Sequence, residues 1–462
     1  MKTTELKQRL REISRHYLRT GFKNGFFHVI GGNTLVKIIS FVSSFLVLHI
    51  LSSQQYGLFM QPDNIVNIVL LFNGLGMSTA MLYYCTIMDD ESEKKAYFKF
   101  ALRFGLVFDV ILIVLAATVL CALNWLPIIF HQKSIYPITG EEAQLLIFLA
   151  LIPFLAFAFE MIQFFLRAER DNRNFSKTSV IFTACYGIFQ VMFVLLLKVY
   201  GFVAGRYLAY AVAIVVGITL LRKKPAMKAA AVTLGRNDKI SIIRFAASAL
   251  TANCFSVIMP YIETLIVYYF VSNFTLRAEF SVAWLPPQSI QFLTSAVMVY
   301  MFPFFARNYK DGRWLRSNSK KLYITLFVVM TVIVIGGILL TPVIIRSFIG
   351  IQYYNAQEIR MMRIFWVAFG VNCALKTPTA NILSAIGQIR FNTVNSILST
   401  LVQTVICWVL ISRFGLNGAA YGLLCGYILS SVGGIVYLRY YCKRLIKRHE
   451  TNVPEVEIED QV

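Results

Sequence analysis

Long apolar runs of about twenty residues alternate with short polar stretches along the whole of this chain. A run of that length can cross the hydrocarbon core of a bilayer, about 30 Å thick, as one α-helix. We therefore predict an all-α polytopic membrane protein with twelve transmembrane helices. The predicted spans are residues 27–51, 57–84, 98–123, 145–166, 177–197, 201–221, 241–269, 278–305, 321–345, 359–385, 391–412 and 416–438.

The composition argues against a soluble globular protein. Of the 462 residues, 57% are hydrophobic and 15% are charged, whereas soluble domains carry about 25% charged residues. The eight cysteines lie singly, which indicates neither a disulfide framework nor a metal site. We expect no cofactor. The N-terminal region lacks the short apolar core of a signal peptide, so we expect none to be removed.

The basic charge of the chain predicts its orientation in the membrane. With the N-terminus placed in the cytoplasm, 34 of the 44 Lys and Arg residues fall on the inner side and 7 on the outer side. Cytoplasmic loops carry an excess of Lys and Arg, so we predict that both termini are cytoplasmic. The net charge of +21 is then explained by topology and by attraction to anionic lipids, without a nucleic-acid partner.

Six predicted spans precede a basic linker and six follow it. We predict a cytoplasmic basic amphipathic segment at 1–24, an N-lobe at 25–221, a cytoplasmic linker at 222–240, a C-lobe at 241–442 and a cytoplasmic tail at 443–462. An even number of spans in each lobe gives both lobes the same orientation. The lobes should therefore be related by a pseudo-twofold axis along the membrane normal.

Two stretches of the sequence indicate an internal repeat. "YGFVAGRYLAY" at 200–210 and "FGLNGAAYGLL" at 414–424 both open on an aromatic–glycine pair and carry small residues four positions apart. Small residues at this spacing let helices approach closely in lipid. A second pair, "YGLFMQPDNI" at 56–65 and "FSVAWLPPQSI" at 280–290, places Pro62 opposite Pro286. We predict that each lobe closes with a tightly packed helix.

Four short motifs, in this order and spacing, resemble one transporter family. They are "ILSSQQYGLF" at 50–59, "NGLGMSTAMLYYCT" at 73–86, "FIGIQYYNAQEIR" at 348–360 and "SRFGLNGAAYG" at 412–422. Together they resemble the polysaccharide transporter branch of the multidrug/oligosaccharidyl-lipid/polysaccharide (MOP) exporter superfamily, over roughly residues 25–442. The nearest members are the O-antigen and capsular repeat-unit flippases. The chain departs from lipid II flippases because it lacks their Arg-rich first helix and their extra spans.

The resemblance implies a substrate and a mechanism. The protein would be a flippase of the plasma (inner) membrane that moves undecaprenyl-pyrophosphate-linked oligosaccharide repeat units to the outer leaflet by alternating access. H⁺ or Na⁺ would be the coupling ion. We expect a monomer that works beside polysaccharide polymerase and export machinery. A cation-coupled multidrug antiporter of the same superfamily remains the alternative.

An enzyme is disfavoured by the absence of catalytic motifs. The largest predicted outer loop has about twenty residues and one histidine, His131. The run "GLGMST" at 74–79 is only a fragment of a Gly-rich loop and lies in a predicted span. We therefore expect transport rather than catalysis.

Basic residues inside spans are candidates for binding the substrate phosphates. An ionised residue at the centre of a span costs about 2.5–3.5 kcal/mol on insertion scales, so it must face the interior, form a pair or reach the interface. Lys37 and Lys376 are the main candidates, and the alternative is an ion pair with a carboxylate such as Glu160. Arg206 and Arg244 are weaker candidates, with a structural pair and a topology charge as their alternatives.

Acidic residues inside spans are candidates for binding the coupling ion. Glu263 follows Pro260, and Asp63 follows Pro62, so each carboxylate lies near carbonyls that a helix break would free. Glu160 and Asp109 complete this set of candidates. The alternative is that these acids neutralise buried cations. The candidate hinges, which could equally be static kinks, are Pro62, Pro260, Pro286 and Pro378.

Overall fold

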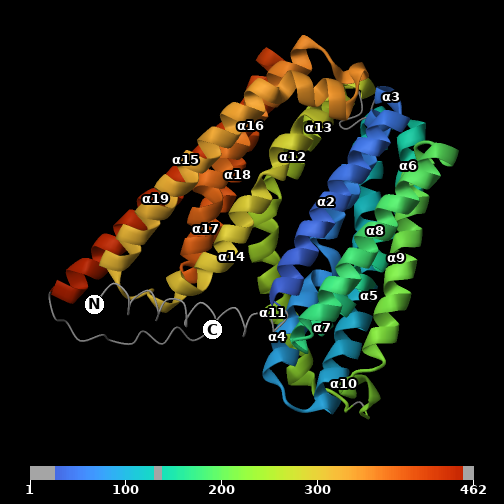
Figure 1. Ribbon diagram of the computed structural model, residues 1–462. Coiled ribbons are helices and arrows are strands. Elements are labelled where there is room, and N and C mark those ends of the chain that lie inside the picture. The colour runs from blue at the N-terminus through green and yellow to red at the C-terminus, as the bar shows by residue number, and fades with distance from the viewer. Residues whose placement is uncertain (1–25, 130–137, 231, 451–462) are drawn as a thin grey trace. The chain divides into compact units, whose positions relative to one another are not determined.

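A computed structural model describes residues 26–129, 138–230 and 232–450 of the chain (Figure 1). Every regular element in these residues is a helix, which confirms the predicted all-α class. The predicted amphipathic segment at 1–24 and the end of the predicted tail lie outside the described residues. The helices form two compact units, Met1–Cys254 and Phe255–Val462, and each is described here by itself.

Unit 1 contains the elements drawn from blue to green in Figure 1. They are α2 (Phe26–Ile50), α3 (Ser53–Leu71), η1 (Asn73–Gly76), α4 (Met77–Ile87), α5 (Glu91–Ile129), α6 (Gly140–Leu149), α7 (Ile152–Ala168), α8 (Asn172–Leu197), α9 (Tyr200–Leu221), α10 (Pro225–Lys228) and most of α11 (Arg236–Val257).

Unit 2 contains the elements drawn from yellow to red. They are α12 (Met259–Phe270), α13 (Phe274–Ser289), α14 (Gln291–Arg307), α15 (Gly312–Ile344), η2 (Ile345–Ile349), η3 (Ile351–Tyr353), α16 (Ala356–Val371), η4 (Asn372–Lys376), α17 (Thr377–Ala385), α18 (Ile389–Phe414) and α19 (Leu416–Glu450).

Ten helical stretches in the described part of the chain are long and apolar enough to cross a membrane. They match ten of the twelve predicted spans. The remaining two are helical but irregular. The span predicted at 241–269 is divided between α11 and α12 at Ile258, and the span predicted at 359–385 contains the π-helical turn η4. The protein is a multi-pass membrane protein.

The two units repeat the same helix contacts. In unit 1, α8 packs on α9, α2 on α8, α3 on α6 and α4 on α7. In unit 2, α18 packs on α19, α12 on α18, α13 on α16 and α14 on α17. Each pair holds the same place in the order of helices along its unit. This correspondence confirms the internal repeat.

Small residues bring the last two helices of each unit together. A Cβ atom on Gly201 would collide with the backbone of Phe193 in α8, and a Cβ atom on Gly418 would collide with the backbone of Leu410 in α18. Close approach of this kind maximises van der Waals contact where lipid supplies no hydrophobic driving force between helices. The predicted tight packing of α9 and α19 is confirmed.

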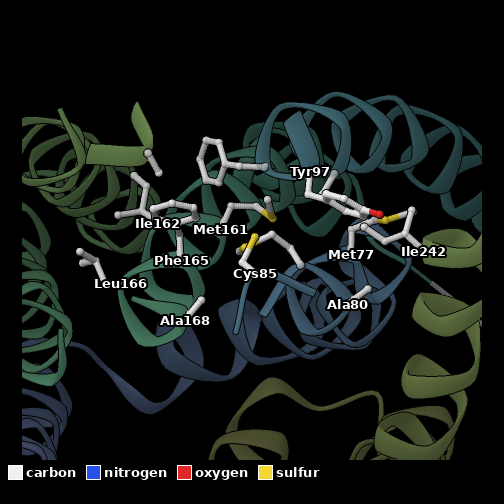
Figure 2. Close-up of a cluster of buried hydrophobic side chains, with 14 of the residues drawn as sticks. Met77, Ala80, Cys85, Tyr97, Met161, Ile162, Phe165, Leu166, Ala168 and Ile242 are labelled. Carbon is white, nitrogen blue, oxygen red and sulfur yellow. The ribbon is translucent and has the colours of Figure 1, made fainter. Parts of the chain in front are cut away.

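The core of unit 1 extends to the first turns of α11. Figure 2 shows Ile242 of α11 beside Met77 and Tyr97, and all three belong to one buried cluster. Ala246, one turn further along, is also in this cluster. The beginning of α11 therefore belongs to unit 1, although the sequence places it at the start of the C-lobe. The boundary between the units falls after Cys254 because these apolar contacts hold α11 to unit 1.

Candidate functional site

The second predicted span of unit 1 is broken in the middle. After α3 ends, Gly74, Leu75 and Gly76 have positive φ angles of 58°, 54° and 73° before α4 begins. A Cβ atom on Gly74 would also collide with the ring of Phe157 on α7, so both the φ angle and the close contact require glycine. The break predicted at Pro62 is not seen, because Pro62 lies within the continuous helix α3.

Asp109 of α5 occupies the break. Its side chain is 0% exposed, and its Oδ1 accepts the Gly74 N–H at 2.7 Å. With the Asn73 amide oriented to satisfy both of its ends, its nitrogen lies 3.0 Å from both Asp109 carboxylate oxygens. Backbone groups that a helix break frees within the membrane need partners from the protein, and Asp109 supplies one for the Gly74 N–H. Asp109 thus stabilises the break.

A polar cavity of about 400 Å³ lies next to this break in unit 1. Glu160 of α7 is a half-buried residue in its wall and accepts a hydrogen bond from Ser78 Oγ at 2.8 Å. Within the described ranges, no Lys or Arg forms an ion pair with Glu160. The other polar residues of the wall are Asn33, Asn73, Gln163, Ser179, Thr183 and Tyr210. The cavity offers hydrogen-bonding groups and one unneutralised carboxylate.

Lys37 lies one helical position from this wall. Val36 and Asn33 of α2 line the cavity, whereas Lys37 itself is exposed. No carboxylate of the described residues lies within 4.0 Å of its ammonium group. The alternative that Lys37 pairs with Glu160 is therefore not seen.

Asp63 and Arg206 form an ion pair within unit 1. The Arg206 guanidinium lies 2.6 Å from Asp63 Oδ1, and the two side chains are 14% and 20% exposed respectively. Asp63 Oδ2 also accepts a hydrogen bond from Asn67 at 3.0 Å, and the guanidinium lies 5.8 Å from the centre of the Tyr186 ring. Each charge neutralises the other. This geometry matches the structural alternative for both residues, and we include neither in the proposed substrate or ion site.

Lys376 of unit 2 is an unpaired cation in an irregular part of a span. It ends the π-helical turn η4, a feature often found at functional sites. Its ammonium group lies 4.9 Å from the centre of the Tyr427 ring and 4.0 Å from Met259 Sδ. The side chain is partly buried, and no carboxylate of the described chain pairs with it. The Lys376 ammonium group therefore lies beside an aromatic ring and has no carboxylate partner among the described residues.

Glu263 of α12 is buried deeper in unit 2. It is 1% exposed, and its Oε2 accepts a hydrogen bond from Gln403 of α18 at 2.9 Å. Its Oε1 is buried without a hydrogen-bond partner. A carboxylate in this state lacks half of its usual hydrogen bonds, which suits a group that binds a proton or a small cation.

The remaining candidates occupy less distinctive positions. Arg244 is exposed on α11. Pro260 and Pro378 lie in the first turn of α12 and α17, directly after breaks in their spans, as a hinge would require. Pro286 lies inside the continuous helix α13.

Comparison with known proteins decides the family. A family model described as "Polysaccharide biosynthesis protein" matches residues 46–358 of this chain. The chain belongs to this family. No curated protein matches the chain.

Solved structures show that the chain has the fold of MOP transporters. An inward-facing multidrug resistance MATE transporter matches with a TM-score of 0.72 at 15% identity, over 89% of this chain and 96% of that one. The lipid II flippase MurJ, in an inward closed conformation, matches with a TM-score of 0.65 at 12% identity, over 92% and 93%. A MOP transporter from Pyrococcus furiosus matches with a TM-score of 0.61 at 16% identity, over 91% and 95%. At these identities the likeness establishes the fold alone.

Sequence reasoning missed three groups that shape these sites. The break at residues 73–76 had a signal, since an Asn-Gly-Leu-Gly run inside a span is unusual. Gln403 and Tyr427 had none, because an isolated glutamine or tyrosine in an apolar helix does not reveal its distant partner.

Proposed function

We propose that this protein is a flippase that moves polyprenyl-pyrophosphate-linked oligosaccharide repeat units from the cytoplasmic to the outer leaflet by alternating access. The family to which it belongs supports a role in polysaccharide biosynthesis, and its fold is that of transporters. The lipid II flippase with the same fold supports a lipid-linked substrate.

The observation that carries the proposal is the unpaired ammonium group of Lys376 beside the Tyr427 ring. A cation within a membrane span that has no carboxylate partner is costly unless it meets an anion. The pyrophosphate of the substrate supplies that anion, and an aromatic ring suits the apolar face of a sugar. Lys37 is the second cation that we assign to the substrate path, since it is also unpaired among the described residues.

We further propose that translocation is coupled to H⁺ or Na⁺. Glu263 has an oxygen without a partner, and Glu160 lines a polar cavity without a neutralising cation nearby. Asp109 already accepts the Gly74 N–H and so has a structural role as well. Both termini would lie in the cytoplasm of a cell whose plasma (inner) membrane holds the protein, as the basic residues predict.

The test is translocation of a polyprenyl-pyrophosphate-linked oligosaccharide in proteoliposomes. Lys376→Ala removes the charge, Lys376→Arg keeps it, and Lys320→Ala, at an exposed lysine of α15, is the matched control. A hydrogen bond to a charged group is worth about 1.5–3 kcal/mol, so we expect Lys376→Ala to lower the rate about 10- to 100-fold. Lys376→Arg should retain more activity than Lys376→Ala, and Lys320→Ala should match the wild type.

Two results would overturn this function. If Lys376→Ala folds and flips as fast as the wild type, Lys376 does not bind the phosphates. If the wild type flips nothing but exports an organic cation against an ion gradient, the protein is a multidrug antiporter.

A further inference from the structure

Two buried glutamates, linked by one asparagine, lie where α13 and α16 begin in unit 2, at the end of these helices that the sequence assigns to the outer side. Glu279 of α13 is 7% exposed, and Glu358 of α16 is 0% exposed. Asn355, the N-cap of α16, joins them. Its Oδ1 accepts the Glu358 N–H at 2.8 Å, and its Nδ2 donates to Glu279 Oε1 at 2.9 Å. Figure 1 shows that both helices reach this end of the unit.

The carboxylate of Glu358 has no positive group to balance it. Both of its oxygens are buried without a hydrogen-bond partner, and so is the hydroxyl of Tyr353. No ion pair involves Glu279 or Glu358 among the residues that the structure describes. An unpaired charge in such a site costs several kcal/mol, so an ionised Glu358 would not stay there. The site needs an added positive charge.

The Tyr353 hydroxyl is a second buried polar group without a hydrogen-bond partner at this end of the unit. Burial, followed by the nearby Glu358 and Glu279 carboxylates, raises the pKa of the Tyr353 hydroxyl. The hydroxyl therefore remains a neutral donor at physiological pH. Burial, and next the Glu279 carboxylate, also raise the pKa of Glu358, which precedes the span predicted at 359–385.

The corresponding glutamate of unit 1, Glu142, has hydrogen-bond partners for its carboxylate. Glu142 is the third residue of α6, as Glu358 is of α16, and it is also 0% exposed. Its Oε2, however, accepts hydrogen bonds from the Thr139 backbone at 2.8 Å and the Thr139 hydroxyl at 3.0 Å. The α3–α6 contact of unit 1 corresponds to the α13–α16 contact of unit 2. A buried glutamate here thus needs no ligand when it caps its own helix, and Glu358 does not do so.

Two arginines on these helices are already engaged. Arg277 of α13 donates to the Val271 carbonyl at 2.6 Å and to the Tyr268 carbonyl at 3.0 Å. Arg363 of α16 donates to the Ile338 carbonyl of α15 at 3.3 Å. Neither arginine forms an ion pair with the two carboxylates.

A proton suits this site better than a metal ion. Ca²⁺ takes about 6–8 oxygen ligands and Mg²⁺ about six. The site offers two carboxylates and the Tyr353 hydroxyl, since the Asn355 amide oxygen is already used by the Glu358 N–H. Two neighbouring carboxyl groups, by contrast, commonly share one proton because both cannot ionise together.

We propose that Glu279 and Glu358 form a carboxyl pair that binds a proton where α13 and α16 begin. This site is distinct from the four acids assigned to ion coupling from the sequence. The bound proton removes the unpaired charge from the α13–α16 contact, and its loss at high pH loosens that contact. The inference does not depend on the transport proposed above, and its test requires no substrate.

The first test is the pH dependence of unfolding for the full chain in detergent micelles. The folded state holds a proton that an ordinary glutamate, with a pKa of about 4.3, releases in the unfolded state. Stability contributed by the pair is therefore present at low pH and falls as pH rises toward the raised pKa of Glu358. Glu358→Gln should flatten this decline, and Glu279→Gln should move it to lower pH, because the second carboxylate that raises the pKa of Glu358 is lost. Glu142→Gln is the matched control and should keep the wild-type profile, because glutamine also completes a capping box.

The second test is infrared spectroscopy of the same proteins. The wild type and Glu142→Gln should show the carbonyl band of a protonated carboxyl group at neutral pH, and Glu358→Gln should lose intensity there. If Glu358→Gln does not fold, Glu279→Gln still tests the pair, because the decline of stability with pH should then move to lower pH. The proposal fails if the folded variants keep the wild-type pH profile and band. The proposal also fails if adding Ca²⁺ or Mg²⁺ at high pH stabilises the wild type but does not stabilise Glu358→Gln. That result would mean that the pair binds a metal ion.

Discussion

The ion pair between Asp63 and Arg206 should be a main source of stability in unit 1. Its atoms are 2.6 Å apart, and the side chains are 20% and 14% exposed. Asp63→Asn replaces the carboxylate by a neutral group of the same shape, whose oxygen can still accept from Asn67 while its nitrogen faces the Arg206 guanidinium. The change therefore removes both the negative charge and the acceptor that Arg206 uses.

The expected loss of stability depends on how deeply Arg206 is buried once Asp63 is replaced. Breaking a fully buried ion pair by removing one member costs about 3–5 kcal/mol. The residual exposure lets water screen the remaining guanidinium, and the Tyr186 ring 5.8 Å away stabilises it. A cation–π contact of this kind is worth about 0.5–1 kcal/mol. We therefore expect Asp63→Asn to destabilise the protein by about 2–3 kcal/mol.

The assay is chemical denaturation in detergent micelles followed by circular dichroism. Arg206→Gln should cost about as much as Asp63→Asn, and the double variant should cost clearly less than the sum, with a coupling energy of at least about 1 kcal/mol. Arg244→Gln is the control at an exposed arginine and should stay within about 0.5 kcal/mol of the wild type. Additive effects of the two single changes would refute this reasoning.

Two further changes probe the loops and breaks of unit 1. Gly74→Ala should destabilise the protein by about 2–4 kcal/mol in the same assay, because alanine is strained at a φ of 58° and collides with Phe157. Gly31→Ala, in open space on a helix, should be neutral or stabilising, and equal losses for the two would contradict the account. Asp171 pairs with Lys224; burial acts to raise its pKa, but the hydrogen bonds from Lys224 and Asn174 outweigh burial and lower it. The Asp171 carboxylate contributes to stability at pH values above its pKa in the unfolded chain, about 3.9. That contribution is lost as pH falls through its lower pKa in the folded protein. The stability gap between wild type and Asp171→Asn should therefore narrow on acidification, and Lys224→Gln should behave likewise; a gap that does not change with pH would contradict this.

The spans were predictable because the length and hydrophobicity of a segment decide whether it crosses the membrane. A helix must be long and apolar enough to cross the bilayer, and that property can be read from a short window of sequence. The repeat was predictable for a similar reason, since small residues four apart mark a helix face that packs closely. The exact places where spans are interrupted, at 73–76, at Ile258 and at η4, were not predicted.

Partners within the membrane were not predictable from the sequence. The candidate acids and bases were located correctly as ionisable residues in spans, but Asp63 and Arg206 lie 143 positions apart, and Glu263 and Gln403 lie 140 apart. Nothing local distinguishes a carboxylate that pairs with arginine from one that accepts an amide. The Glu279 and Glu358 pair was missed because both residues lie at helix beginnings, where an acid is ordinarily explained by the helix dipole.

The polar character of the span at 359–385 has a consequence for how the protein enters the membrane. Arg360, Arg363 and Lys376 lie in this segment, and it is not among the ten helices apolar enough to cross a bilayer. A translocon that tests each segment against lipid would favour its release to water rather than its insertion. Its contacts with α13, α15 and α19 must therefore help to retain it. We expect this span to integrate only with its neighbours, so that assembly of unit 2 follows the synthesis of α19 near the end of the chain.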